Sequence, residues 1–168
     1  MLWIDWMTLA IVLGVAITQT VRGVKAGGMG LPMFEAAGFV VAAVAATNLS
    51  GGIAQALHMQ KAVVMLVMFV LLGVGALFLG RWLYTVTDLS FQSLDGFFSF
   101  VFGVVVGWIF AHMVLRIIMG FQGTGGFVVG AIDTAPVARE IFQFRGWNWL
   151  MRLLFRVRLG PEFNPDIG

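Results

Sequence analysis

The stretch AVVMLVMFVLLGVGALFLG, residues 62–80, carries no charged side chain and is bounded by Lys61 and Arg81. As a helix rising about 1.5 Å per residue it extends about 28 Å, close to the roughly 30 Å hydrocarbon thickness of a bilayer. A backbone in lipid must satisfy its own hydrogen bonds, so this stretch predicts a membrane-spanning helix and not a strand.

The composition of the whole chain agrees with a membrane location. Hydrophobic residues make up 60% of the 168 residues and charged residues 11%, whereas soluble domains carry about 25% charged residues. Basic residues exceed acidic ones, ten against eight, and most of them follow the last apolar segment, so lipid headgroups are the expected acidic partner and nucleic acid is not. The absence of cysteine excludes disulfides, thiolate metal sites and a cysteine nucleophile.

Charges and loop residues divide the chain into an all-α membrane protein with four transmembrane helices and an amphipathic C-terminal helical tail. The predicted spans are residues 6–21, 31–49, 62–80 and 96–115. A Gly-rich linker is predicted at 117–132, an interfacial helical tail at 133–159 and an irregular end at 160–168. Asp133 or Thr134 is expected to cap the tail helix, with Pro136 in its first turn.

The N-terminus lacks the basic start of a secretory signal, so the first helix is expected to be retained. The orientation stays open, because counting all basic residues of the tail and counting only those near the spans favour opposite sides.

The tail has two distinct faces. Leucine and valine side chains between 150 and 157 share one face, and arginines share the other, which is typical of a helix lying on a bilayer or a neighbouring protein. The residues expected to contact the membrane surface are Trp147, Trp149, Arg152 and Arg156.

Small residues recur at four-residue spacing in the fourth span. Such a stripe lets another helix backbone approach closely in lipid. It predicts a helix-packing interface with the same chain, another copy or another membrane protein, and a shorter stripe in the first span is its expected intramolecular counterpart. The two stripes are Ser99, Gly103, Gly107 and Ala111, and Ala10, Gly14 and Thr18.

Glu35 is the only carboxylate inside a predicted span. An ionisable group at that depth suggests a proton or cation site by default. Because Glu35 lies about one turn from the helix start, the favoured interpretation is an interfacial carboxylate that reaches headgroup water and is stabilised by the helix dipole. Asp5, Arg22 and Lys25 are expected to be anchors paired with each other or with lipid.

No pattern in the sequence predicts chemistry. His58 and His112 have no further ligand at metal-binding spacing, and the glycines from Gly120 to Gly126 lack the following Lys-Ser or Lys-Thr of a phosphate loop. No serine has a histidine and an acid at usable positions. We therefore predict no catalytic, cofactor-binding or metal-binding residue, and a protein that is not an enzyme.

Several short motifs resemble those of the colicin V production family, the CvpA-type inner-membrane proteins of bacteria. The likeness covers residues 3–115, with Gly96, Ser99 and Val106 departing from the family pattern. The motifs are Trp3-Ile4-Asp5, Arg22-Gly23, Thr87-Asp88-Leu89-Ser90, Leu94-Asp95, Phe102-Gly103 and Gly107. The resemblance implies a multi-pass protein of the bacterial inner membrane linked to bacteriocin production and envelope homeostasis, without a defined biochemical activity.

The leading functional prediction is a non-enzymatic structural or accessory component that acts through helix packing. Three alternatives remain open at this point: an accessory subunit of a large membrane complex, an oligomeric channel or transporter component with Glu35 in the path, and lipid binding by the tail.

Overall fold

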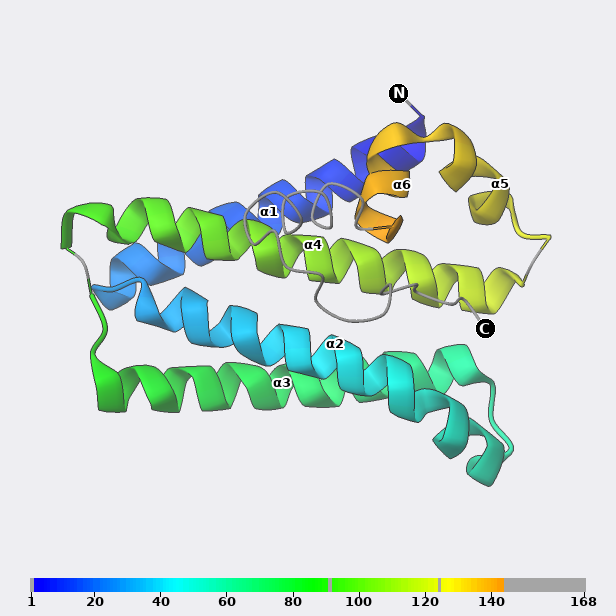
Figure 1. Ribbon diagram of the computed structural model, residues 1–168, viewed down its shortest axis with the longest axis horizontal. Coiled ribbons are helices and arrows are strands. Elements are labelled where there is room, and N and C mark those ends of the chain that lie inside the picture. Colours follow the sequence, from blue (N-terminus) through cyan, green and yellow to red (C-terminus); the bar gives the residue numbers. More distant parts are fainter. Residues whose placement is uncertain (1, 91, 124, 144–168) are drawn as a thin grey trace, which may run out of the picture.

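The structure is a computed structural model that describes residues 2–90, 92–123 and 125–143. Over these residues it is all-helical (Figure 1). Four helices are long and apolar enough to cross a membrane, which makes the chain a multi-pass membrane protein. They are α1 (Trp3–Ala26), α2 (Gly30–Leu57), α3 (Lys61–Thr87) and α4 (Asp95–Gln122). The shorter elements are η1 (Gln92–Leu94), α5 (Phe127–Thr134) and α6 (Pro136–Gln143).

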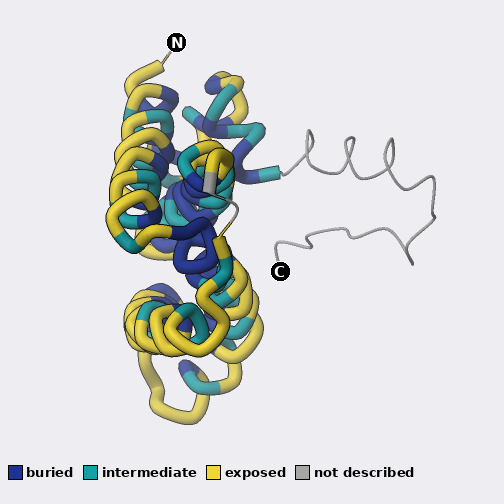
Figure 2. Tube along the Cα trace, turned by 90° about the vertical axis from the view of Figure 1, so that its left-hand side faces the viewer, coloured by how far each residue is buried: buried dark blue, intermediate teal, exposed yellow. Residues whose placement is uncertain are grey.

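The four long helices form two antiparallel pairs. Helix α1 packs along α4 and α2 packs along α3, while α2 against α4 makes the main contact between the pairs. Figure 2 views the bundle along its length, with exposed positions on the outside and buried ones facing between the helices. The exposed side chains include many large apolar ones, such as Leu71 and Phe78 on α3, and these outer faces contact lipid.

Glycines set the close approach within each pair. A Cβ atom on Gly103 would lie 2.8 Å from the Cα of Ala16, and one on Gly107 would lie 2.6 Å from the carbonyl oxygen of Val12. In the other pair, a Cβ on Gly38 would lie 2.7 Å from the Cβ of Ala76. Helices in lipid associate by such close packing because burying apolar surface gives them no advantage over lipid contact.

An aromatic and aliphatic cluster fills the space between the two pairs. Phe39 of α2, Phe69 of α3 and Phe110 of α4 meet edge to face or tilted, with ring centroids 5.0–6.4 Å apart. Val106 and Met113 of α4 complete this cluster and are almost completely buried. The bundle core is therefore centred on the faces of α2 and α4 that oppose each other.

The helices extend beyond the predicted spans, and the predicted linker is the clearest difference. Residues 117–122 continue α4 and residues 127–134 form α5, so only 123–126 connect the two helices. The reason is burial: Ile117 packs into the interhelical cluster, and Val128 and Ile132 pack against α4. Gly123 adopts a positive φ of 71° where the chain leaves α4.

Helices α5 and α6 fold back beside the start of α1 and the end of α4 (Figure 1). The predicted tail cap is different in the structure, because neither Asp133 nor Thr134 caps α6. The Oδ1 atom of Asp5 accepts the backbone N–H groups of Val137 (3.0 Å) and Ala138 (3.1 Å) instead. The rest of the predicted tail, with Trp147, Trp149, Arg152 and Arg156, lies outside the described residues.

Candidate functional site

The most polar site within the bundle is a cluster around the carboxylate of Glu35. Glu35 is 0% exposed. Its Oε1 accepts a bond from Nη2 of Arg22 at 2.6 Å, and its Oε2 accepts bonds from Nη1 of Arg22 at 2.8 Å and Nε2 of Gln19 at 2.7 Å. The Oε1 of Gln19 also accepts a longer bond from Arg22, 3.4 Å. The carboxylate is therefore held by a two-pronged ion pair and an amide, the geometry that binds a carboxylate most strongly.

This arrangement corrects the favoured interpretation of Glu35. The carboxylate does lie near one end of the bundle, level with the last residue of the 62–80 stretch, because a Cβ on Gly80 would lie 2.9 Å from Glu35 Cγ. It does not reach solvent, however, because Arg22 and Gln19 enclose it. The half-exposed Arg22 side chain, 39% accessible, covers the cluster from the outside.

The cluster joins the two helix pairs. Arg22 and Gln19 lie on α1, and Glu35 lies on α2, which belongs to the other pair. Helices α1 and α2 otherwise share only a small contact. Opposite charges cancel within the cluster, so it lowers the penalty of burying Glu35 while fixing the two pairs in register.

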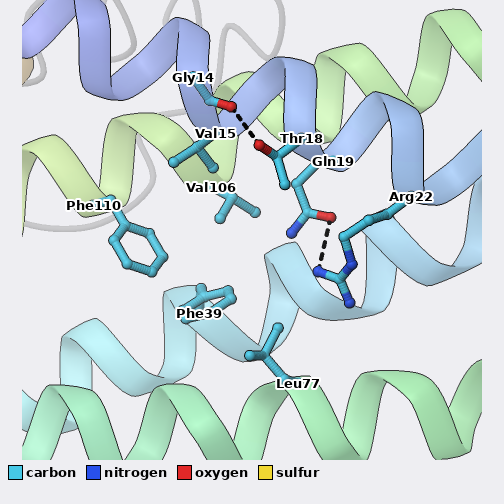
Figure 3. Close-up of a pocket in the computed structure, with 9 residues that line it drawn as sticks. All are labelled: Gly14, Val15, Thr18, Gln19, Arg22, Phe39, Leu77, Val106 and Phe110. Carbon is cyan, nitrogen blue, oxygen red and sulfur yellow. Dashed lines mark hydrogen bonds between the residues drawn. The ribbon is translucent and has the colours of Figure 1, made fainter.

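A lateral groove runs from this cluster along α1. It has a volume of about 240 Å³ and is open on one side. Figure 3 shows Gly14, Val15 and Thr18 on α1, with Gln19 and Arg22 at one end. The apolar side chains of the other three helices line the rest, namely Phe39, Leu77, Val106 and Phe110. Glu35 is not part of the lining.

A second hollow lies between the start of α1 and α5. It has a volume of about 390 Å³ and is lined mainly by apolar residues and glycines. The rings of Trp3 and Phe127 stack beside it, with centroids 6.1 Å apart and planes 9° from parallel. Both side chains are exposed, as suits aromatic residues at a membrane interface.

Two other aspartates hold chain segments together. Buried Asp5 binds the start of α6 and also accepts the Leu2 N–H at 3.2 Å. Asp95, at the start of α4, accepts the Met29 N–H at 3.0 Å and the Ser90 hydroxyl. Both carboxylates therefore satisfy backbone donors at helix starts, which are otherwise left without partners.

The structure places the predicted α4 stripe against α1 of the same chain. Ser99 and Ala111 are 0% exposed, and Gly103 and Gly107 meet Ala16 and Val12. The stripe is therefore covered within the chain and does not offer a surface to another protein.

The predicted counterpart on α1 is different. Ala10, Gly14 and Thr18 are exposed, and Thr18 donates its hydroxyl proton to the Gly14 carbonyl at 2.8 Å. The α1 residues that face α4 are Val12, Ala16, Gln19 and Gly23. A strict four-residue spacing predicted the stripe on α1, whereas the buried face of this helix follows the 3.6-residue helical period.

The two histidines have separate surroundings. His112 packs its ring on Phe142, with centroids 5.5 Å apart, and its Nδ1 lies 3.3 Å from the Ile141 carbonyl oxygen. His58 ends α2 with a positive φ of 53°. Within the described residues, no group of three histidines or acids lies close enough to hold a metal ion.

These features define a class: a multi-pass helical membrane protein whose buried polar groups act as joints between helices. Comparison with protein-family models, with curated proteins and with solved structures gave no match to this chain.

Proposed function

We propose that this protein is a non-catalytic structural or accessory component of a membrane assembly. The observation that carries the proposal is the closed environment of Glu35. The Glu35 carboxylate is 0% exposed and is bound by Arg22 and Gln19, as in a joint that stabilises the bundle. A group that binds and releases protons or cations needs a route to water.

The placement of the other polar groups supports the same proposal. Asp5 and Asp95 bind backbone N–H groups at helix starts, and His112 lies against the end of α6. Each of these groups has a bonding role within the fold. Their arrangement favours a protein that presents a fixed helical surface to neighbours in the membrane.

The resemblance to CvpA-type proteins enters the proposal through the same residues. Asp5, Arg22, Asp95 and Gly103 belong to the resembling motifs, and each makes a contact between segments distant in the sequence. We therefore include in the proposal a location in the bacterial inner membrane and a role linked to bacteriocin production or envelope homeostasis.

A transport role is the second candidate, and the groove beside Arg22 and Gln19 favours it. If several copies of the chain enclosed a transport path, each copy would contribute the polar groups at the end of its apolar groove. In that case Glu35 acts through Arg22, and altering Glu35 changes flux.

The first experiment is purification of the tagged protein, expressed at its native level, in a mild detergent. Mass spectrometry identifies the proteins that accompany it, and an unrelated multi-pass protein with the same tag gives the background. The accessory role predicts at least one other membrane protein in stoichiometric amount. Recovery of this chain with no such protein would overturn it.

A flux measurement separates the transport role. Vesicles containing the wild-type chain or the Glu35→Gln variant are compared for uptake of protons and monovalent cations. The accessory role predicts the background flux of protein-free vesicles for both. Flux by the wild-type chain that Glu35→Gln abolishes would establish the transport role instead.

A further inference from the structure

Between Gly30 and Gly52, the outer face of α2 carries one exposed polar side chain, while the other exposed positions of this part of the helix are apolar or glycine. Asn48 is exposed, and no hydrogen bond joins its side chain to the described residues. The two polar side chains flanking it differ, because Thr47 donates to the sulfur of Met113 and Ser50 donates to the Thr47 carbonyl. Asn48 therefore projects away from the bundle core.

The depth of Asn48 follows from the pairing of α2 with α3. These helices are antiparallel, with Glu35 beside Gly80 and Gly38 beside Ala76. Continuing that register places Asn48 level with Leu66. Leu66 is four residues inside the 62–80 stretch, about 6 Å from its end. The Asn48 amide thus lies within the hydrocarbon layer.

An amide at this depth is unfavourable without a partner. An amide that leaves water for an apolar environment loses its hydrogen bonds to water, and without a new partner this loss is not compensated. Thr18 and Thr20 on α1 avoid this penalty within the chain, because their hydroxyls bond the Gly14 and Ala16 carbonyls. No described residue plays this part for Asn48, so its amide requires a partner beyond the described residues.

The neighbours of Asn48 permit such a partner to approach. Val44 and Gly52 lie one turn before and one turn after Asn48 on the same face, and both are exposed. A Cβ on Gly52 would meet nothing within 4 Å. A second helix can therefore come close to the α2 backbone beside Asn48, as small residues allow in lipid.

We propose that this face of α2, formed by Val44, Asn48 and Gly52, is a self-association surface on which a second copy of the chain docks. A side-chain amide carries both donors and an acceptor, so two Asn48 amides can bond each other reciprocally. A two-fold axis along the membrane normal brings the same residue of both copies to the same depth. Any other partner must supply a polar group of its own at that depth.

This inference goes beyond the proposed function, because a dimer needs no second kind of protein. The test uses the cysteine-free chain as the background for single-cysteine variants. Val44→Cys reports on the proposed surface. Val70→Cys on α3 is the matched control, since it lies at the same depth and is 52% exposed, against 53% for Val44.

Oxidative cross-linking is carried out in native membranes. We expect a disulfide-linked homodimer for Val44→Cys and only a background level for Val70→Cys. Adding Asn48→Leu to Val44→Cys should diminish the cross-link, while Asn48→Gln should retain it. Because Asn48→Leu replaces an exposed side chain with one that suits lipid, the fold should survive, and unchanged tryptophan fluorescence would verify this.

The loss of dimer affinity is measured by diluting the protein into excess lipid. Energy transfer between labelled copies reports how much dimer remains at each dilution. Asn48→Leu should weaken the dimer by about three- to tenfold, the range expected for one or two interhelical hydrogen bonds. Equal cross-linking at positions 44 and 70, or an undiminished cross-link with Asn48→Leu, would overturn the inference. A cross-link from position 44 to a different protein would show that this protein, and not a second copy of the chain, docks on the surface.

The outcomes are separable from those of the proposed function. A stoichiometric partner protein without a position-44 homodimer would leave the accessory role standing and remove the dimer. A homodimer without any partner protein would support the self-association surface and overturn the accessory role.

Discussion

The ion pair of Glu35 and Arg22 should respond unequally to the loss of either member. Arg22→Gln leaves a carboxylate that is 0% exposed with Gln19 as its remaining partner. Glu35→Gln leaves a guanidinium whose side chain is 39% exposed and can turn toward the headgroups. Removing one partner of a buried pair costs about 3–5 kcal/mol, whereas exposed pairs contribute about 0–1 kcal/mol.

From these limits we expect Arg22→Gln to lower the free energy of unfolding by about 3–5 kcal/mol. Glu35→Gln should lower it by a smaller amount, about 1–3 kcal/mol, because the remaining charge is partly solvated. The double variant should be no less stable than Arg22→Gln alone, since it leaves no unpaired charge.

The assay is reversible unfolding in mixed micelles with a denaturing detergent, followed by tryptophan fluorescence. Circular dichroism of each variant before unfolding shows that the helices are intact. Equal losses of unfolding free energy for the two single variants, or a larger loss for Glu35→Gln, would refute the reasoning. The burial of the charge that remains would then not determine how much stability is lost.

Three further predictions use the packing of individual positions. Gly107→Leu should separate α1 from α4 and lower the free energy of unfolding by about 1–3 kcal/mol or more. A Cβ on Gly14 meets nothing within 4 Å, so Gly14→Leu should change the free energy of unfolding by no more than about 0.5 kcal/mol. Unfolding in mixed micelles compares the two variants. Gly80→Val should press on Glu35 and speed detergent unfolding, unlike Gly75→Val on the open face of the same helix. Asp5→Asn weakens the acceptor for two N–H groups of α6 and should expose that helix to limited proteolysis while α2 and α3 stay protected; an unchanged cleavage pattern would refute the capping role.

The spans could be predicted from the sequence because their signal is local. Residues 62–80 are apolar without interruption, and the structure places them in α3. The ends were harder: α3 continues through Arg81 to Thr87, since a helix that leaves the hydrocarbon layer can keep its own hydrogen bonds in the polar interface. Composition marks the edge of the lipid, not the end of the helix.

The contacts of the candidate site could be predicted only in part. Glu35 stands out because a carboxylate in an apolar run is unusual, but its partner depends on how α1 and α2 are placed. The sequence did contain one unused signal: Gln19 and Arg22 lie three residues apart, on one face of a helix, and α2 follows directly. The contact between Asp5 and α6 joins residues more than 130 positions apart, and no local pattern indicates it.

The nesting of the two helix pairs affects how the chain is made. Gly23 of α1 packs beside Ser99 of α4. At usual elongation rates of about 5–20 residues per second, Ser99 is synthesised about 4–15 s after Gly23. During that interval α2 and α3 can already form their hairpin between the two. Glu35, by contrast, follows Arg22 by 13 residues. The charge of Arg22 can therefore be neutralised long before α4, the main packing partner of α1, has been synthesised.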